Sequence, residues 1–384
     1  MMKITEGSHA VAEAVRLCRP QVVSAYPITP QTHIVEALAD YVANCRLDAE
    51  YITVDSELSA LSACVGASAA GSRTYSATTS QGLMLMSEVV FNASGMRLPI
   101  VMSIANRAMG APLSIWNDQQ DSVALRDAGW LQFYAEDVQE ATDLHFLAYK
   151  VAEDTRIQVP AYVCFDGFIL SHTYEPVDML SQEDVDRFLP PYKPAERLDA
   201  SDPISFGMYA TPDYYHEFRY ELDQAVMRAK DVIAEYGKEF GALFGRDYSG
   251  LVEEYRMDDA ETAIIAMGSV CGTIKDAVDE MRDAGKKVGL LRIRVFRPFP
   301  SEEIAKALSG VKRVAVLDKN ISLGAKGATA IEVRDAMYGS DVMVKGYIVG
   351  LGGRDIKKDD IKEIVSLCEK GIGDQFYGLR KELI

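Results

Sequence analysis

Five polar side chains in the amino-terminal half of the sequence each follow an apolar segment with the composition of a buried strand. They are Thr29, Glu57, Gln81, Asn106 and Arg107. In an open sheet of parallel strands, ligands bind in the crevice outside the carboxyl ends of the strands. The set offers a hydroxyl, a carboxyl, two amides and a guanidinium. It therefore predicts one edge of a sheet that binds a small polar ligand.

Thr29 lies in a segment that two prolines make stiff. The stretch YPITPQTH (26–33) places it between Ile28 and Pro30, after an apolar run and before a helix-like run. Each proline lacks a backbone donor and disfavours helical conformation in the residue before it. We therefore expect a stiff, extended corner between a strand and a helix, with the Thr29 hydroxyl held at the strand end.

The other polar residues have similar surroundings. Glu57 belongs to DSE, which follows the apolar run AEYITV. Gln81 lies in TSQG, where Ser80 is a plausible N-cap and the helix N-terminus could bind an anion. Asn106 and Arg107 follow LPIVMSIA and open a loop, NRAMGAP. All of these positions would lie on the same edge of a parallel sheet.

Each residue also has a purely structural interpretation. Thr29 could cap the following helix, and Glu57 could be a first-turn acid that favours the helix dipole. Arg107 could form a surface ion pair, although its loop follows a buried strand. We expect His172 to be a structural histidine, because no HExxH or Cys/His cluster accompanies it, and Trp116 to be a packing residue. Only the shared position at successive strand ends favours a binding site.

The order of strands and helices predicts an α/β fold. In residues 1–175, apolar strands alternate with helical segments, which indicates a doubly wound α/β domain. The expected strands are 22–26, 49–54, 73–78, 98–105, 131–135 and 161–165, and the expected helices are 59–71, 81–95 and 141–155.

The rest of the chain divides into two parts. Residues 176–257 begin with a charged, proline-rich stretch and continue into one or two helices, which indicates a linker or arm. A second α/β unit is expected over 258–384, with strands at 263–267, 287–296, 313–318 and 344–351 and helices at 273–285 and 329–339. The stretch GSVCGT (268–273) is expected to be a turn, because it lacks the lysine of a phosphate-binding loop.

Composition excludes several classes of function. The formal net charge of −17 argues against nucleic acid or an anionic membrane as partner. The six cysteines are scattered without a CxxC pair, so neither an iron–sulfur cluster nor another metal site is expected on this chain. No secretory signal or membrane-spanning segment is apparent, which predicts a cytoplasmic protein.

Blocks spread over nearly the whole chain resemble one enzyme family. They are YPITP, SELSA, GASAAG, TTSQGLMLM, SGMRLPIVMSIANRA, PLSIWNDQQDS, RDAGW, DGFILSHT and VDRFLPPY. Together they are similar to the alpha subunit of pyruvate:ferredoxin oxidoreductase in its four-subunit form, within the 2-oxoacid:ferredoxin oxidoreductase family. The resemblance implies a pyrimidine-binding-type domain of thiamine diphosphate enzymes. It also implies that a transketolase C-terminal-like α/β domain follows.

The resemblance assigns roles to the predicted site residues. Glu57 matches the cofactor-activating glutamate, which would hydrogen-bond the aminopyrimidine ring of thiamine diphosphate. Tyr26, Ile28 and Gln81 are expected to contact the same cofactor. For the substrate, Arg107 would neutralise the pyruvate carboxylate, Thr29 would orient it, and Asn106 is expected nearby. The catalytic set implied by the family is thus Glu57, Thr29 and Arg107.

The family also implies partner subunits. A GDG…N signature for the diphosphate and its Mg²⁺ is absent here, and in split enzymes it belongs to the beta subunit. Iron–sulfur clusters belong to the beta and delta subunits. The chain would thus carry half of an active site and work with beta, gamma and delta subunits. The implied reaction is the reversible oxidative decarboxylation of pyruvate with coenzyme A to acetyl-CoA and CO2, with electrons passed to ferredoxin through other subunits.

Two alternatives stay open at this point. The sequence has DSELSA where the family more often has ESEHA, so Asp55 and Leu58 replace an acid and a histidine while Glu57 is kept. The chain could belong to a related enzyme that acts on another 2-oxoacid. It could also be a non-catalytic scaffold subunit that kept the fold.

Overall fold

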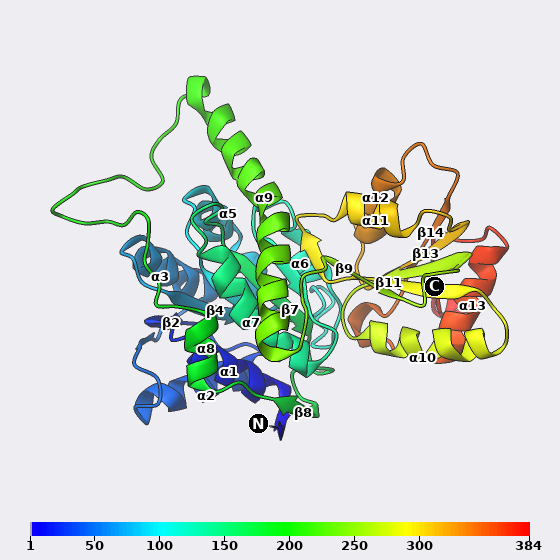
Figure 1. The fold of residues 1–384 in the computed structure, drawn as a ribbon, viewed down its shortest axis with the longest axis horizontal. Helices are drawn as coiled ribbons and strands as arrows, with labels where there is room; N and C mark the ends of the chain where they lie inside the picture. The colour runs from blue at the N-terminus through cyan, green and yellow to red at the C-terminus, as the bar shows by residue number, and fades with distance from the viewer. Residues whose placement is uncertain (1) are drawn as a thin grey trace.

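A seven-stranded sheet forms the centre of the amino-terminal unit in the computed structural model, which describes residues 2–384 (Figure 1). Its strand order is β12-β6-β7-β5-β4-β2-β3, and all neighbours are parallel except β12 and β6. Six of its strands lie in the amino-terminal part of the chain: β2 (Val22–Ser24), β3 (Glu50–Ile52), β4 (Thr74–Thr78), β5 (Val101–Asn106), β6 (Leu131–Tyr134) and β7 (Ala161–Asp166). The parallel order places the carboxyl ends of β2, β3, β4 and β5 along one edge.

Helices cover both faces of this sheet, so the predicted doubly wound α/β fold is confirmed. One face packs against α1 (Gly7–Leu17), α2 (Thr32–Ala43) and α7 (Val138–Ala152). The other packs against α3 (Glu57–Ala69), α4 (Ser80–Leu85) and α5 (Ser87–Gly95). A short helix, α6 (Gln120–Ala124), lies in the loop between β5 and β6.

The helix expected over 81–95 is wrong as a single element. The chain forms α4 and α5, which meet at Met86, where ψ is −7° and departs from the ideal α-helical value of about −42° while the residue stays in the right-handed helical region. The N-cap of α4 is Thr79, and Ser80 is its first residue. Gln81 is thus the second residue of α4, a helix of six residues.

The segment after β7 returns to the start of the chain. Strand β8 (Tyr174–Asp178) pairs antiparallel with β1 (Met2–Glu6), and α8 (Gln182–Phe188) follows with a capping box of Ser181 and Asp184. An extended arm then leads to α9 (Pro212–Phe244), which is a single helix of 33 residues. Figure 1 shows the arm reaching away from the body and the start of α9 projecting beyond it.

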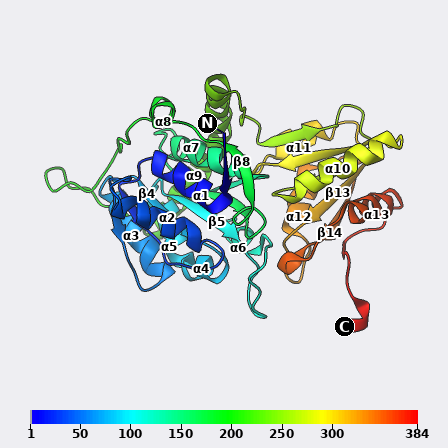
Figure 2. The ribbon, with the colours of Figure 1, turned by 90° about the horizontal axis from the view of Figure 1, so that it is seen from below.

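The carboxy-terminal unit is built on a six-stranded sheet of order β15-β14-β13-β10-β11-β9. Figure 2 shows this unit beside the first one. Its strands are β9 (Val252–Tyr255), β10 (Thr262–Ala266), β11 (Val288–Ile293), β13 (Arg313–Asp318), β14 (Met343–Ile348) and β15 (Gln375–Phe376). Its helices are α10 (Val270–Asp283), α11 (Ser301–Ala307), α12 (Ala328–Ala336) and α13 (Lys358–Glu369), with short 3-10 turns at Leu351–Gly353 and Lys381–Leu383.

The strand expected over 287–296 is also wrong as a single element. After β11 the chain crosses to the first sheet, where β12 (Val295–Arg297) pairs antiparallel with β6. Strand β9, which precedes residue 258, pairs with β11 in the second sheet. The two sheets are therefore tied together by one continuous segment, and no single residue divides them.

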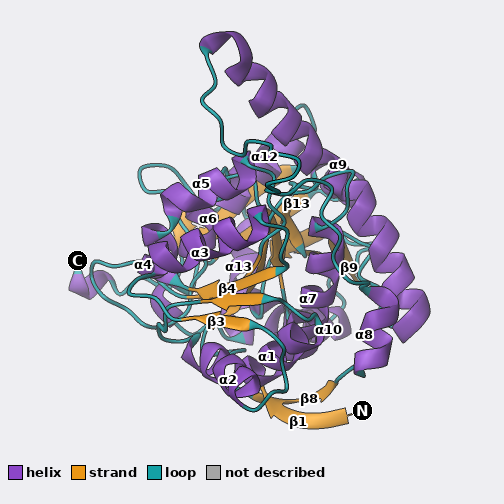
Figure 3. Ribbon diagram, turned by 90° about the vertical axis from the view of Figure 1, so that its left-hand side faces the viewer, coloured by secondary structure: helices purple, strands orange, loops and turns teal. Residues whose placement is uncertain are grey.

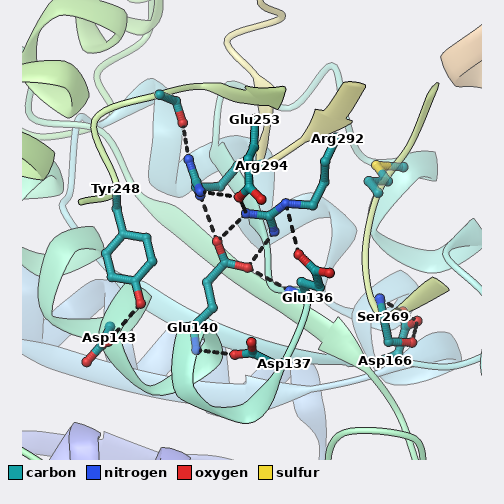
Figure 4. A network of polar contacts seen from close by, with 12 residues as sticks. Glu136, Asp137, Glu140, Asp143, Asp166, Tyr248, Glu253, Ser269, Arg292 and Arg294 are labelled. Carbon is teal, nitrogen blue, oxygen red and sulfur yellow. Dashed lines mark hydrogen bonds and ion pairs between the residues drawn. The ribbon is translucent and has the colours of Figure 1, made fainter. Parts of the chain in front are cut away.

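A buried ion-pair network holds this crossing in place (Figure 4). Arg292 Nη1 and Nη2 lie 2.5 and 2.7 Å from the two carboxylate oxygens of Glu140 on α7. Arg294 Nε lies 2.7 Å from Glu140 Oε1, and both arginines contact Glu253 of β9. Although burial acts in the opposite direction, the two guanidiniums lower the pKa of Glu140 to about 2. Residues of both units thus share one set of charges.

Over residues 2–384, we find no helix that is both long and apolar enough to cross a membrane.

Candidate active site

The structure brings Thr29, Gln81 and Arg107 together at the carboxyl edge of the first sheet. Arg107 Nη1 donates to the backbone oxygen of Thr29 at 2.8 Å, and Arg107 Nη2 is 3.4 Å from Gln81 Oε1. These residues come from three different strand ends, after β2, β4 and β5. The parallel strand order, with β2, β4 and β5 adjacent, is the reason they meet.

Arg107 carries a positive charge whose hydrogen-bond acceptors are all uncharged. Besides Thr29 and Gln81, its Nε donates to the backbone oxygen of Ser114 at 3.2 Å. The residue is only 6% exposed, and burial lowers the pKa of its guanidinium, which still stays protonated at neutral pH. Such a group can bind a small carboxylate. The surface ion pair that was the structural alternative for Arg107 does not form within residues 2–384.

The Thr29 side chain does not cap the following helix. The N-cap of α2 is Gln31, and Thr29 is exposed. Gln31 is a residue that the sequence analysis missed. Its side-chain nitrogen donates to the backbone oxygens of Tyr26 at 2.7 Å and Ala77 at 3.3 Å, and its backbone nitrogen donates to Ile28 O at 2.9 Å. Gln31 thereby fixes the turn before Pro30 to β4.

Glu57 begins α3 directly after the N-cap Ser56, whose hydroxyl accepts from Ser59 N. Its side chain is mostly buried, with 7% of the residue exposed. No hydrogen bond or ion pair with another of the residues 2–384 holds its carboxylate. A methyl group at Gly82 would lie 2.7 Å from Glu57 Oε1, so the glycine makes room for the carboxylate next to Gln81.

Asn106 lies at the end of β5 but points into the protein. Its side-chain nitrogen donates to Asp121 Oδ1 and Ser122 Oγ, each at 2.7 Å, and the residue is fully buried. Tyr26 is 36% exposed and Ile28 is partly buried, both in the turn before Thr29. The structure thus brings Asn106 near the other residues, with its amide nitrogen already engaged.

Asp121 is the buried centre of this edge, and the sequence analysis missed it as well. Its oxygens accept from the backbone nitrogens of Ser80 at 2.9 Å and Arg107 at 3.0 Å, as well as from Asn106. Burial raises the pKa of Asp121 to about 6 even though these donors oppose the rise. Asp121 joins the loops after β4 and β5 and so positions the Arg107 backbone. In the polar stretch WNDQQDS, which contains two aspartates, nothing in the sequence indicated this role for Asp121.

The remaining candidates have structural partners. The Trp116 ring lies 4.9 Å from that of Phe168, but the residue is 55% exposed, so it packs only in part. In GSVCGT, the Ser269 hydroxyl and backbone nitrogen both donate to Asp166 Oδ2, at 2.5 and 3.2 Å. The turn expected over 268–273 is limited to Gly268 and Ser269, because α10 begins at Val270, and the start of this helix already holds a carboxylate of this chain.

Comparison with known proteins identifies the family. The family model described as "Pyruvate flavodoxin/ferredoxin oxidoreductase, thiamine diP-bdg" matches residues 13–238, more than half of the chain. A second, "Pyruvate:ferredoxin oxidoreductase core domain II", matches residues 260–361. The chain belongs to the pyruvate:ferredoxin oxidoreductase family. The resemblance of the sequence blocks is therefore confirmed, and the predicted edge lies within the match to a thiamine diphosphate-binding domain.

Pyruvate:ferredoxin oxidoreductase subunits are among its similar relatives. "Pyruvate synthase subunit PorA" of Methanosarcina barkeri is 52% identical over 100% of this chain and 98% of its own length. PorA of Methanothermobacter thermautotrophicus is 55% identical over 96% of both chains. "Ketoisovalerate oxidoreductase subunit VorA" of Pyrococcus abyssi is 51% identical over 96% of this chain and 94% of its own length.

A solved structure shares the fold of this family member. The 2-oxoglutarate:ferredoxin oxidoreductase from Magnetococcus marinus, solved with 2-oxoglutarate, coenzyme A and succinyl-CoA bound, matches with a TM-score of 0.72 and 18% identity. The match covers 96% of this chain, and the chain spans 65% of the length of that one. At this identity the likeness supports the arrangement of the two α/β units.

The residues at the edge fit the pyrimidine half of a thiamine diphosphate site. Glu57 has a mostly buried carboxylate that forms no hydrogen bond or ion pair with the other described residues, and Gly82 lies beside it. A buried carboxylate of this kind requires a hydrogen-bond donor. A ring nitrogen of an aminopyrimidine can share a proton with such a carboxyl group, which agrees with the family match over residues 13–238.

Proposed function

We propose that the chain is the alpha subunit of a thiamine diphosphate-dependent pyruvate:ferredoxin oxidoreductase. The reaction is the reversible oxidative decarboxylation of pyruvate with coenzyme A to acetyl-CoA and CO2, with electrons passed to ferredoxin. The observation that carries the proposal is the protonated Arg107 with three uncharged acceptors, on the same edge of the sheet as Glu57, whose carboxylate has no partner among residues 2–384. Family membership supports it.

Each residue has a defined task in this proposal. Glu57 Oε1 or Oε2 shares a proton with a ring nitrogen of the aminopyrimidine, and Tyr26, Ile28 and Gln81 line the same side of the cofactor. Arg107 binds the pyruvate carboxylate, and the Thr29 hydroxyl orients the substrate beside it. Asn106 and Asp121 keep the Arg107 backbone in place. Thiamine diphosphate, when bound, supplies the electron sink for loss of CO2.

The rest of the active site belongs to other subunits in this proposal. Beta, gamma and delta subunits bring the diphosphate and Mg²⁺ site, the iron–sulfur clusters and the contact with ferredoxin. The loop after Arg107 supports a partner at this edge, because it presents Leu113 at 75% exposure and Trp116 at 55% exposure. A cytoplasmic location also stays a prediction.

A second substrate has specific support. VorA proteins, named ketoisovalerate oxidoreductase subunits, are about as similar to this chain as some PorA proteins are. A branched 2-oxoacid carries the same carboxylate and carbonyl as pyruvate, so Arg107 and Thr29 would serve either substrate. The two functions differ in the space left for the substrate side chain, which depends on the partner subunit as well.

The test is a substrate panel on the assembled complex, purified through a tag on this chain. Reduction of ferredoxin is measured with pyruvate, 2-oxoisovalerate and 2-oxoglutarate in the presence of coenzyme A. We expect the highest kcat/KM with pyruvate. A higher kcat/KM with 2-oxoisovalerate would favour the VorA-like function. A complex without any 2-oxoacid-dependent activity, containing no thiamine-binding partner, would favour the scaffold alternative.

A further inference from the structure

Three of the five histidines of the chain gather around one buried glutamate, and none of these four residues belongs to the site assigned above. Glu6 ends β1 and is 7% exposed. His9 lies in the first turn of α1, His33 lies in the first turn of α2, and His172 lies in the loop after β7. Figure 3 shows β1, β8, α1 and α2 together at this end of the molecule. Three segments far apart in the sequence, at residues 6–9, 33 and 172, thus supply one cluster.

Both carboxylate oxygens of Glu6 face imidazoles. Oε1 lies 2.6 Å from His33 Nδ1, and Oε2 lies 3.6 Å from His9 Nδ1. The rings of His33 and His172 have their centres 4.7 Å apart. One ligand atom from each of Glu6, His33 and His172 lies within 4.8 Å of the others.

The protein holds these residues in fixed positions. The Gly7 and Ser8 backbone nitrogens donate to Thr173 O at 3.0 Å and Ser171 O at 2.8 Å, and the Ser8 hydroxyl also reaches Ser171 O at 2.8 Å. A methyl group at Gly7 would lie 1.9 Å from Leu170 O, so only glycine permits this approach of α1 to the loop. The loop with His172 is therefore fastened directly to the residue after Glu6.

The histidine of this loop also has an outer partner. His172 Nδ1 lies 2.7 Å from Ser171 Oγ, which accepts a hydrogen bond from Phe168 N at 2.8 Å. A metal-binding histidine usually donates its second ring N–H to such an oxygen, which fixes the ring and its tautomer. This arrangement leaves Nε2 of His172 as its metal ligand.

We propose that Glu6, His33 and His172 bind a divalent ion of the zinc class, with His9 or a water as fourth ligand. Imidazole nitrogens with one carboxylate are the ligands that Zn²⁺ takes in proteins. At metal–ligand distances of about 2.0–2.2 Å, tetrahedral ligand atoms lie about 3.3 Å apart. The present separations bracket that value, from 2.6 Å between His33 and Glu6 to at most 4.8 Å across the set.

The ion would act as a structural link between β1, α2 and the loop after β7. His33 lies four residues after Thr29, so the link would also hold the turn that presents Thr29. This inference does not depend on the proposed reaction. It concerns metal binding by Glu6, His33 and His172, none of which is assigned a role in that reaction.

The test is a titration of the chelator-treated, 384-residue chain with Zn²⁺. Isothermal titration calorimetry measures the affinity, and thermal unfolding measures the change in Tm. We expect one equivalent to bind with a Kd at or below about 1 μM and to raise the Tm. In His172→Gln and His33→Gln, the affinity should fall by at least 100-fold. Ser171→Ala should weaken binding by about 10- to 100-fold, because it removes only the outer partner.

His216→Gln is the matched control, because His216 is exposed on α9 and lies outside the cluster. It should bind Zn²⁺ as the wild-type chain does. The inference is overturned if the wild-type chain binds no equivalent at micromolar concentration, or if the His33 and His172 variants bind as tightly as it does. Independently of the variants, Co²⁺ bound to the wild-type chain should show the visible absorption of a four-coordinate site, and a weak octahedral spectrum would contradict the assignment.

Discussion

At the scale of single residues, the charge of Arg107 is the feature that most directly indicates a ligand. Buried guanidiniums usually pair with carboxylates, as Arg73 does with Glu153 at 2.6 Å in this protein. Arg107 instead donates to two backbone oxygens and an amide. Its hydrogen bonds orient it without neutralising it, which is what the binding of a substrate carboxylate requires.

Arg107→Ala should therefore raise the KM for pyruvate in the assembled complex. The loss of a charge-assisted hydrogen bond costs about 1.5–3 kcal/mol, which corresponds to roughly a 10- to 100-fold increase in KM. The KM of Arg107→Lys should lie between those of the wild-type and Arg107→Ala complexes, because lysine keeps the charge and loses the planar fork. Steady-state kinetics at varied pyruvate measure both. An unchanged KM in the alanine variant would remove Arg107 from the substrate site.

Sequence patterns could predict the site residues that directly follow strands. They could not predict the residues that fix those loops through hydrogen bonds. Thr29, Gln81 and Arg107 follow apolar runs, so the topology of a parallel sheet places them together. Gln31 and Asp121 act through hydrogen bonds to backbone groups distant in the chain, at Ala77, Ser80 and Arg107. Such contacts depend on the path of loops in space, which has no period or motif in the sequence.

At the scale of elements, the position of α4 against α3 determines where Glu57 lies. The two helices approach closely at Gly82, where a methyl group would lie 2.6 Å from Thr78 Oγ1 and 2.7 Å from Glu57 Oε1. Both helices begin at strand ends, after β4 and β3. Gly82 thus connects the packing of the helices with the placement of the carboxylate proposed to act on the cofactor.

Gly82→Ala should lower kcat by about 10-fold or more, because the new methyl group displaces the Glu57 carboxylate from its productive position. Gly66→Ala is the matched control, since Gly66 lies within α3 with no atom near the added methyl group. It should keep full activity and gain about 0.5–1 kcal/mol of stability from the higher helix propensity of alanine. Turnover of the complex and urea unfolding of the chain measure the two effects. Equal turnover in both variants would contradict the proposed contact.

The sequence could not predict the element boundaries that depend on contacts with distant parts of the fold. The run KVGLLRIRVF has the composition of one strand, but Arg292 and Arg294 both reach Glu140 of α7 at the crossing between the sheets. The break between α4 and α5 occurs at Met86, which is fully buried and helical in preference. Tertiary contacts override local preference at such positions.

At the scale of the whole molecule, the two α/β units behave as one body because their contact is charged and buried. Arg292 is 1% exposed and Glu140 is 4% exposed, and Lys275 of α10 adds a contact to Glu136 at 2.7 Å. On the edge that carries the site, Lys319 of the second unit contacts Asp166 at 2.8 Å. The second unit therefore supports the base of the predicted active site without supplying the assigned residues.

Glu140→Gln should destabilise the chain by about 3 kcal/mol, because it removes the buried carboxylate that both guanidiniums share and leaves them the more exposed Glu253 as common partner. Differential scanning calorimetry would measure this, with Asp279→Asn as control, since Asp279 forms a surface pair with Arg256 and should leave the Tm nearly unchanged. If the two variants unfold at the same temperature, the network does not hold the units together.

The same network predicts the acid sensitivity of the fold. The folded-state pKa of Glu140, about 2, is below its ordinary value of 4.5, so the stabilisation is present above pH 4.5 and is lost as the pH falls from 4.5 towards 2. The Glu140→Gln variant lacks this titration. Its free energy of unfolding should therefore change less than that of the wild-type chain over that pH range.

The central claim is that this chain supplies the pyrimidine half of a thiamine diphosphate site, with Glu57 as the carboxylate that contacts the ring. The most direct measurement is kcat of the assembled complex carrying Glu57→Gln, with cofactor and subunit content checked. Glu88→Gln is the matched control, because Glu88 is also a first-turn glutamate but is exposed on α5. We expect kcat to fall at least about 100-fold in Glu57→Gln and to stay within about twofold in Glu88→Gln. A Glu57→Gln complex that retains activity within a few-fold of wild type would contradict the account.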